Sequence, residues 1–317
     1  MKVLVTDAEY TSLDIEAHVL TAAGHQLVTA SCRTPTDVIE AAIGADALLV
    51  QYAPITAEVL QALPQLRLVS RYGVGVDVVD TAAASERGVW VCNVPDYGTE
   101  EVALHAVAML LALMRNIAGH DREVRAGRWD YQLGGPLRRP SFLTLGVVGL
   151  GRIGRMTAER AGPWFGAVVG YDPYLPDDAW PNDIERLDVP DLFARSSAVT
   201  LHLPLTDTTR EFVGTDLLAR MPPGSYLVNT ARGGLVDLDA VLDALEDGHL
   251  AGVALDVLPQ EPPPKGHPLL SHPRALVTPH VAWYSTDAEI ELRRKAAQNI
   301  VDWARTGRPT YAVVEGR

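Results

Sequence analysis

The chain has 317 residues, of which 47% are hydrophobic and 21% are charged, and this is the length and composition of two ordinary globular domains. Its net charge of -13, with the arginines scattered along the chain, argues against nucleic acid as a partner. Two cysteines are too few for a disulfide framework and lack metal-ligand spacing, and no run reaches the roughly 18 apolar residues of a membrane span, so we expect a cytoplasmic protein without metal or membrane contact.

Residues 1–95 alternate short apolar runs with amphipathic stretches, which is typical of a parallel sheet covered by helices. The runs that we expect to form strands are 2–6, 26–30, 46–50, 67–70 and 89–92. The segment 99–117 then predicts one long helix that begins at Thr99. Because this helix is apolar on most sides, we expect it to be buried between two bodies.

A second series of apolar runs predicts a second α/β unit, with strands at 144–148, 167–172, 198–203, 225–229, 251–257 and 275–279. Residues 286–306 then predict an amphipathic helix that ends at Thr306 and Gly307. This helix has no strand to follow in its own unit, so we expect it to return to the first domain. The expected domains are therefore 1–97 with 287–317, and 98–286.

Three glycines, Gly149, Gly151 and Gly154, form a G-x-G-x-x-G frame that chance alone would produce in about one chain in ten. Here the frame follows a strand and opens a helix, and the next strand ends at Asp172, as in dinucleotide-binding sites. Gly149 permits a tight turn, Gly151 lets the backbone approach a pyrophosphate, and Gly154 lets the helix pack on its strand. Asp172 would accept the ribose hydroxyls and repel a 2′-phosphate, which favours NAD over NADP. The alternative is a glycine-rich turn with a solvated acid.

Four polar residues, Arg232, Asp256, Glu261 and His280, come just after predicted strands of the second unit, where open α/β sheets bind ligands. His280 suits a proton donor for a carbonyl oxygen, and the fork of Arg232 suits a cation that holds the substrate. Glu261 could pair with the imidazole and stabilise its charged form. Taken singly, each has an ordinary alternative: a surface or core histidine, an arginine that caps a helix, and a solvated acid.

Six stretches of the chain occur in the order typical of one family: RYGVGVDVVD, NVPDYGTEEVA, GLGRIGR, NTARGGLVD, ALDVLPQEP and TPHVAWYS. By these stretches the chain resembles the D-isomer-specific 2-hydroxyacid dehydrogenases, nearly from end to end. The resemblance implies an α/β protein of two doubly wound parallel-sheet domains, in which a Rossmann NAD-binding domain is inserted in a flavodoxin-like substrate domain. The last predicted helix agrees with such a divided substrate domain.

The resemblance also implies roles for single residues. Arg232, Glu261 and His280 match the catalytic residues of the family. Positions matching its cofactor contacts, beside the three glycines, are Arg152, Ile153, Asp172, Leu203, Pro204, Thr230, Ala231 and Asp256. Val74 and Gly75 match positions whose backbone N–H groups hold the substrate carboxylate, and Arg71 is the cation in that loop. Trp283, which resembles a tryptophan of the branch containing the C-terminal-binding protein, is expected to cover the substrate side chain.

The function expected from these features is NAD-dependent interconversion of a small 2-keto acid and a D-2-hydroxy acid. Within the family, residues 91–103 and 279–285 most resemble the branch that includes the C-terminal-binding protein, a corepressor. The resemblance to this corepressor branch keeps a second hypothesis open, an NAD(H)-sensing binding protein with little turnover. Formate oxidation fits less well, since formate enzymes of the family pair the histidine with glutamine, and a phosphonate or phosphite substrate stays open. Val78 and Leu104 depart from the residues of many relatives. The stretch 129–140 suggests a dimer arm, and hence a homodimer.

Overall fold

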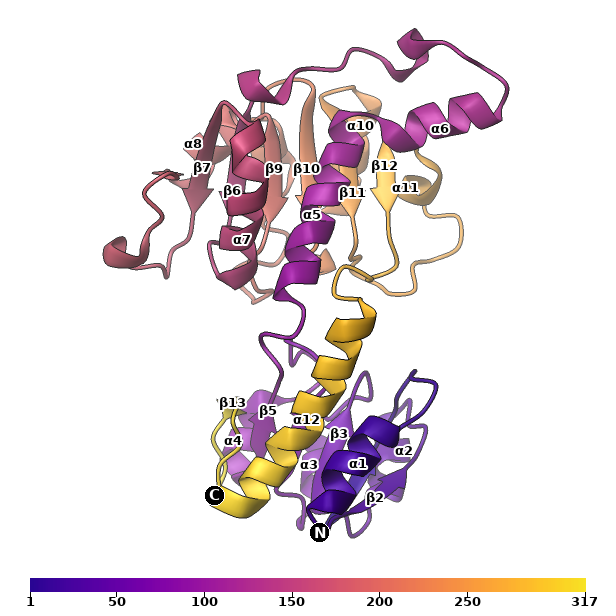
Figure 1. Cartoon of the computed structure of the whole chain (residues 1–317), viewed down its shortest axis with the longest axis vertical. Coiled ribbons are helices and arrows are strands. Elements are labelled where there is room, and N and C mark those ends of the chain that lie inside the picture. The colour runs from indigo at the N-terminus through magenta and orange to yellow at the C-terminus, as the bar shows by residue number, and fades with distance from the viewer. The chain divides into compact units, whose positions relative to one another are not determined.

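The computed structural model describes residues 1–317, and they form two compact units. Unit 1 comprises Met1–Gly98 and Ser285–Arg317, and unit 2 comprises Thr99–Tyr284. Unit 1 therefore contains both ends of the chain, drawn in indigo and yellow in Figure 1. The chain passes between the units at residues 98–99 and 284–285, where the sequence predicted passages at 97–98 and 286–287.

Unit 1 contains a six-stranded sheet in the order β13-β5-β4-β3-β1-β2. Its strands are β1 (Lys2–Val5), β2 (Gln26–Thr29), β3 (Ala47–Val50), β4 (Leu68–Arg71), β5 (Trp90–Cys92) and β13 (Ala312–Val314). The first five are parallel, and their order 2-1-3-4-5 is that of flavodoxin-like sheets, as predicted. The antiparallel strand β13 was not predicted, because three partly exposed residues give no clear alternation.

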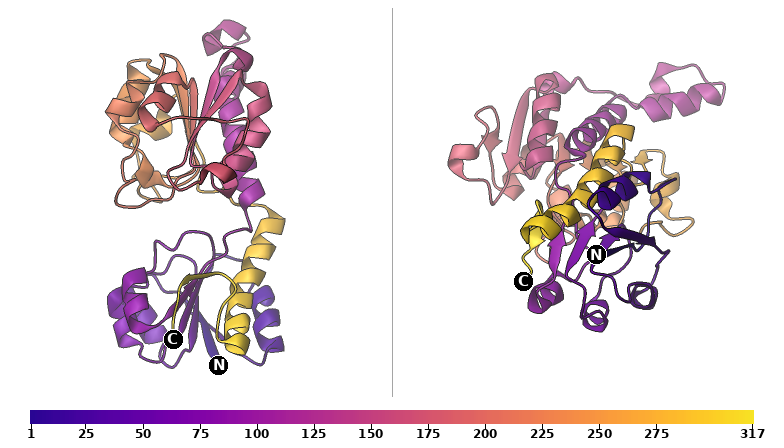
Figure 2. Two further views of the ribbon diagram at one scale, coloured as in Figure 1. Left: turned by 90° about the vertical axis from the view of Figure 1, so that its left-hand side faces the viewer. Right: turned by 60° about the horizontal axis from the view of Figure 1, so that its bottom comes forward.

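Five helices cover the two faces of this sheet: α1 (Asp14–Ala22), α2 (Pro35–Ala41), α3 (Ala57–Ala62), α4 (Thr81–Arg87) and α12 (Thr286–Thr306). Figure 2 shows the yellow α12 beside the indigo α1 on one face, with violet helices on the other. The Ser285 hydroxyl accepts a hydrogen bond from the Ala288 N–H at the start of α12, and Gly307, with φ of 80°, ends the helix.

A buried ion pair fastens α12 to α1 within unit 1. Arg293 donates from Nε and Nη2 to the two carboxylate oxygens of Glu16, both at 2.8 Å, and both side chains are buried. This bidentate arrangement leaves neither charge unpaired in the core. The C-terminal helix is thus part of unit 1.

Unit 2 contains a seven-stranded parallel sheet in the order β12-β11-β10-β9-β6-β7-β8. Its strands are β6 (Thr144–Val148), β7 (Ala167–Tyr171), β8 (Glu185–Arg186), β9 (Ala198–Leu201), β10 (Ser225–Asn229), β11 (Leu250–Leu255) and β12 (Ala275–Val277). Numbered from β6, the order is 3-2-1-4-5-6 with a seventh strand at the edge, which is the Rossmann order. All six predicted strands are present, and only the two-residue strand β8 was missed.

The helices of unit 2 pack on both faces of this sheet, each face over its own hydrophobic core. They are α5 (Thr99–Met114), α6 (Ile117–Arg125), α7 (Arg152–Ala161), α8 (Val189–Arg195), α9 (Thr215–Leu218), α10 (Leu238–Glu246) and α11 (Pro268–Ser271). Short 3-10 turns lie at Tyr131–Gly134, Pro140–Phe142, Gly162–Trp164, Asp177–Ala179 and Gly233–Leu235. The core around α5 includes Met109, Leu110, Leu145 and Val228.

The sequence predicted one helix over 99–117. The prediction of where this helix ends was wrong. Helix α5 stops at Met114, and α6 begins at Ile117 after a bend of 58°. Asn116 adopts φ of 47°, a left-handed conformation that asparagine tolerates, and its side-chain amide donates to the Gly134 carbonyl at 3.2 Å. No single helix is long and apolar enough to cross a membrane, although α5 and α6 together meet the length and hydropathy criteria.

Candidate active site

The three glycines of the loop between β6 and α7 have distinct spatial requirements. A Cβ atom on Gly149, whose φ is 92°, would lie 2.8 Å from the His202 carbonyl group, and one on Gly154 would lie 1.8 Å from the Gly149 oxygen. Neither position can hold a side chain. At Gly151 a Cβ would meet nothing within 4 Å, so this glycine borders open space at the N-terminus of α7. The loop therefore leaves room where backbone N–H groups favour an anion.

Asp172, just after β7, holds the same loop. One carboxylate oxygen accepts the Leu150 N–H at 2.8 Å, and the other accepts the N–H groups of Tyr174 at 2.9 Å and Leu175 at 3.1 Å. An ionised carboxylate has about four acceptor positions, so Asp172 can still accept hydroxyl groups from a ligand. Its position fits the predicted ribose contact.

The remaining predicted cofactor residues lie at the same end of the sheet. Arg152 and Ile153 form the first turn of α7, Leu203 and Pro204 follow β9, and Thr230 and Ala231 follow β10. Among them Thr230 is informative, because its hydroxyl is buried and has no hydrogen-bond partner. A buried polar group without a partner costs free energy unless a ligand completes it. The residues at the start of α7 and those that follow β9 and β10 thus fit a bound dinucleotide.

Glu261 and His280 contact each other directly. The distance between Glu261 Oε2 and His280 Nδ1 is 2.6 Å, and both side chains are about 40% exposed, at 37% and 41%. The other Glu261 oxygen accepts the Leu258 N–H at 2.8 Å. Burial raises the pKa of Glu261, but the hydrogen bonds from His280 and Leu258 and the charge of Arg232 outweigh it, so that this pKa lies below its usual value. Glu261 is therefore ionised beside the imidazole.

The loop that carries His280 is held by Asp256, which is 2% exposed at the end of β11. Its carboxylate accepts the Thr278 hydroxyl at 2.5 Å and the N–H groups of Val281 and Ala282, both at 2.9 Å. Its backbone carbonyl accepts the His280 N–H at 2.8 Å. His280 has φ of 53°, an unfavourable conformation for a side chain, and these bonds fix it.

One residue of this network was missed by the sequence analysis. His105, on α5, has its Nε2 atom 3.1 Å from the Thr278 hydroxyl and 3.7 Å from Asp256 Oδ1. The available signal was a single imidazole in the otherwise apolar middle of a long helix. Its partners follow β11 and β12, so the sequence alone does not show the contact.

Arg232 follows β10 in an extended conformation, with φ of -144° and ψ of 138°. Its Nη1 atom donates to the Ala231 carbonyl at 2.7 Å, and its own carbonyl accepts from the Asn229 side chain at 2.8 Å. Because the charge of Arg232 acts on Glu261, the structure brings Arg232, Glu261 and His280 together at the carboxyl ends of β10, β11 and β12. The catalytic roles of the three residues stay predictions.

The predicted substrate contacts lie in both units. In unit 1, Arg71 ends β4, and the next loop contains Val74 and Gly75; the Val74 carbonyl accepts from the Asn93 side chain at 2.6 Å. In unit 2, the half-buried Trp283 ring meets the Tyr284 ring edge-on, with centroids 5.6 Å apart.

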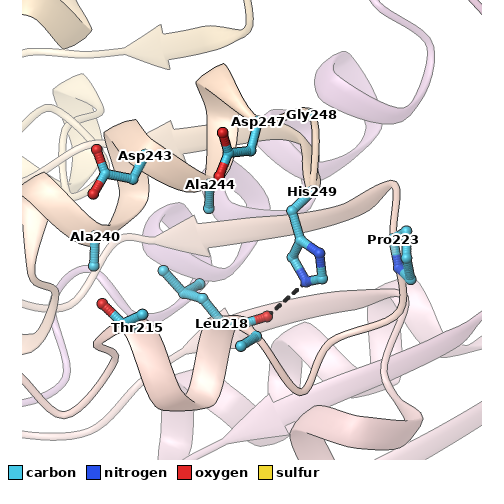
Figure 3. A pocket seen from close by; sticks show the side chains of 10 residues that line it. Thr215, Leu218, Pro223, Ala240, Asp243, Ala244, Asp247, Gly248 and His249 are labelled. Atoms are coloured by element: carbon cyan, nitrogen blue, oxygen red, sulfur yellow. Dashed lines mark hydrogen bonds between the residues drawn. The ribbon is translucent and has the colours of Figure 1, made fainter.

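A cavity of about 530 Å³ lies at the opposite end of the unit 2 sheet, between α9 and α10. Figure 3 shows its lining, in which His249 donates from Nε2 to the Leu218 carbonyl at 2.9 Å. Pro223 and Gly248, at its rim, precede β10 and β11. None of the predicted site residues lines it, so this hollow and the candidate active site are separate.

Comparison with known proteins agrees with this geometry. The family model described as "D-isomer specific 2-hydroxyacid dehydrogenase, NAD binding domain" matches residues 107–282. The chain belongs to this family. The protein has the fold of the D-2-hydroxyacid dehydrogenases and uses NAD as its cofactor. Its reaction is the interconversion of 2-keto and D-2-hydroxy acids, as the sequence predicted.

Three relatives illustrate the match. The chain is 35% identical over 291 residues to glycerate dehydrogenase of Methylorubrum extorquens, covering 88% of this chain and 89% of that protein. It is 40% identical over 274 residues to D-3-phosphoglycerate dehydrogenase of Mycobacterium leprae, but covers 50% of that protein's length. The crystal structure of an NAD-dependent formate dehydrogenase from Staphylococcus aureus in complex with NAD superimposes with a TM-score of 0.87, 30% identity and 100% coverage of both chains.

Proposed function

We propose that this dehydrogenase reduces a small 2-keto acid, of the size of glyoxylate or the keto acid related to glycerate, with Arg232, Glu261 and His280 as its catalytic residues. The observation that carries this proposal is the 2.6 Å contact between Glu261 and His280, in reach of the charge of Arg232. The similarity to glycerate dehydrogenase over 89% of its length supports the choice of small acids.

The chemistry of each residue follows from its contacts. NAD, when bound, supplies or accepts the hydride. Glu261 occupies Nδ1 of His280, so Nε2 is the ring atom that can give a proton to the substrate's carbonyl oxygen or remove one from the alcohol. Arg232 binds the substrate carboxylate through its planar fork and polarises the carbonyl. Asp256 and His105 act through Thr278 and the 278–282 loop, as positioning residues for His280.

The loop after β4 supports a role for unit 1 as the substrate domain. No hydrogen bond within the protein occupies the N–H groups of Val74 and Gly75, so both can donate to a carboxylate. Arg71 is the one cation in the 70–78 loop, which contains no lysine. The 70–78 loop thus matches a substrate with one carboxylate better than a substrate that also carries a phosphate.

Asp172→Ala tests the cofactor site. It is expected to raise the Kd for NADH by roughly tenfold or more, the usual loss when a hydrogen bond to a charged group is removed. The preference for NADH over NADPH should narrow, because the charge that repels a 2′-phosphate is gone. Titration of both cofactors measures this, with the exposed Asp183→Ala as control. An unchanged ratio of the two Kd values would show that the carboxylate does not face the ribose.

Glu261→Gln tests the pairing with His280 through pH. The hydrogen bond from His280 lowers the pKa of Glu261, so the carboxylate accepts from Nδ1 in its ionised form. The neutral glutamine oxygen is a weaker acceptor, so kcat/KM for keto acid reduction should fall and its pH profile should shift. The pH profile of kcat/KM measures the shift, and a profile that stays in place would refute the pairing.

Trp283→Ala tests whether the indole covers the C2 side chain of the substrate. Burying one methylene contributes about 0.8 kcal/mol, so the rise in KM should grow from glyoxylate through pyruvate to 2-ketoisocaproate. Steady-state kinetics on these three acids measure it. Equal losses on all three, or a lower melting temperature with unchanged kinetics, would place Trp283 outside the substrate site.

Two further properties belong to this proposal. The arm around residues 129–140 exposes Trp129 (89%) and Tyr131 (82%), which supports a homodimer in which a second copy covers these rings. Cys32 and Cys92 are buried free thiols, in keeping with a reducing cytoplasm.

The alternative, an NAD(H)-sensing binding protein, rests on the resemblance of 91–103 and 279–285 to the corepressor branch. A panel of 2-keto acids with NADH, followed by absorbance at 340 nm, separates the two. Turnover of a small keto acid supports the dehydrogenase, and no turnover on any acid favours the binding protein.

A further inference from the structure

Two hydrogen bonds hold the 73–75 loop, which follows β4, to the residues that follow the neighbouring strand β5. The Gly73 carbonyl accepts the Val94 N–H at 2.9 Å, and the Val74 carbonyl accepts from Asn93 Nδ2 at 2.6 Å. Strands β4 and β5 are paired and parallel, so both segments leave the sheet at the same edge. Two successive carbonyl groups of the loop are therefore bound to one short segment of the chain.

These bonds determine where the N–H groups of Val74 and Gly75 point. A trans peptide group is planar, with its N–H directed opposite to its C=O, and the cis peptide bond of this chain lies elsewhere, before Pro262. The Val74 N–H shares a peptide group with the Gly73 carbonyl, and the Gly75 N–H shares one with the Val74 carbonyl. Both N–H groups thus point away from residues 93–94, and neither donates a hydrogen bond within the protein.

Asn93 is itself fixed by the C-terminal part of unit 1. Its backbone carbonyl accepts from Asn299 Nδ2 at 2.9 Å, and its N–H donates to the Tyr311 carbonyl at 3.2 Å. Asn299, on α12, is 1% exposed, and its Oδ1 atom accepts the Tyr311 N–H at 3.2 Å. Because its backbone N–H and C=O are both bonded, Asn93 presents its side-chain amide to Val74 from a fixed position.

The peptide group between Val74 and Gly75 needs such a bond to keep its direction. Its rotation changes ψ of Val74 and φ of Gly75, and glycine adopts positive and negative φ about equally readily. The Gly73–Val74 peptide group is held by a backbone N–H, that of Val94, whereas the Val74 carbonyl is held by a side chain. A rotated peptide group would turn the partial negative charge of the Val74 carbonyl, instead of the Gly75 N–H, towards an anion.

We propose that Asn93 is a positioning residue for the substrate carboxylate, because it keeps the Gly75 N–H directed towards that group. In the proposed function, on which this role rests, the Val74 and Gly75 N–H groups bind the carboxylate of a small keto acid. Asn93 acts through the Val74–Gly75 peptide group and not by contact with the reacting atoms. Its side chain therefore contributes to substrate binding and not to the transfer of the proton or the hydride.

Asn93→Ala and Asn93→Asp test this role. Alanine removes the donor, so the KM for the keto acid that is reduced best should rise roughly three- to tenfold, the effect of one ordinary hydrogen bond. Aspartate keeps the size of the side chain, but it cannot donate when ionised and adds a negative charge, so the KM should rise further. Both kcat and the Kd for NADH should change little, as expected when substrate binding alone is weakened.

Oxamate, an unreactive carboxylate analogue of small keto acids, measures binding without turnover. Its Kd on the NADH-bound protein should rise in parallel with the KM in the two Asn93 variants. The matched control is Asn182→Ala, an exposed asparagine before β8, which should behave as wild type.

The possible failures can be told apart. Wild-type protein that neither reduces a keto acid nor binds oxamate would overturn the proposed function and the role of Asn93 with it. Wild-type protein that does both, with an unchanged KM and oxamate Kd in both Asn93 variants, would overturn the role of Asn93 alone. A lower melting temperature with an equal rise in the Kd for NADH would also overturn this role, because it would show a general structural effect.

Discussion

His280→Ala is expected to lower kcat for keto acid reduction by roughly 10²-fold or more, the usual contribution of a positioned acid-base group. The reason is the contact with Glu261, which occupies Nδ1 and leaves Nε2 as the proton donor. The Kd for NADH should change little, because the glycine loop and Asp172 are separate from the 278–282 loop. Steady-state kinetics and NADH titration measure the two effects.

The exposed His18 on α1 provides a matched control, and His18→Ala should keep full activity. If His280→Ala retained most of the wild-type kcat, another group or water would have to supply the proton. A large rise in the Kd for NADH would indicate a disturbed cofactor site instead.

Arg232→Gln is expected to lower kcat/KM by roughly 10²- to 10⁴-fold, with a rise in KM and a fall in kcat. Two hydrogen bonds to charged groups contribute about 1.5–3 kcal/mol each, and about 1.4 kcal/mol corresponds to a factor of ten. Glutamine keeps the length of the side chain but loses the charge and the fork. The extended backbone at this position does not depend on the guanidinium, so the fold should persist.

The exposed Arg220→Gln is the control for Arg232, because it removes the same charge elsewhere in unit 2. A loss of activity in both variants would point to the overall charge rather than to a substrate contact. An unchanged KM in Arg232→Gln would show that another cation, such as Arg71, holds the carboxylate.

Much of the fold was predictable because parallel strands buried on both faces are continuous apolar runs. Eleven runs of this kind gave eleven of the thirteen strands, and the missed strands, β8 and β13, have two and three residues. The break at Asn116 was not predictable, since it depends on a left-handed residue bonded to Gly134, which is distant in the sequence.

The candidate site was also predictable only in part. Glycines and charged residues just after strands could be placed because the carboxyl ends of parallel strands meet at one edge. Other contacts could not be predicted, because they depend on where side chains of α5, β11 and β12 point. They are the bonds of Asp256 to the 278–282 loop and the contact of His105 with Thr278.

The most direct test of the central claim is oxidation of a 2-hydroxy acid by wild-type protein with NAD, comparing the D and L forms of the acid whose keto form is reduced best. We predict that the D form is oxidised, that the L form is not, and that His280→Ala loses the reaction with the D form. Tight binding of NADH without turnover of either form would contradict the account and support an NAD(H)-sensing binding protein.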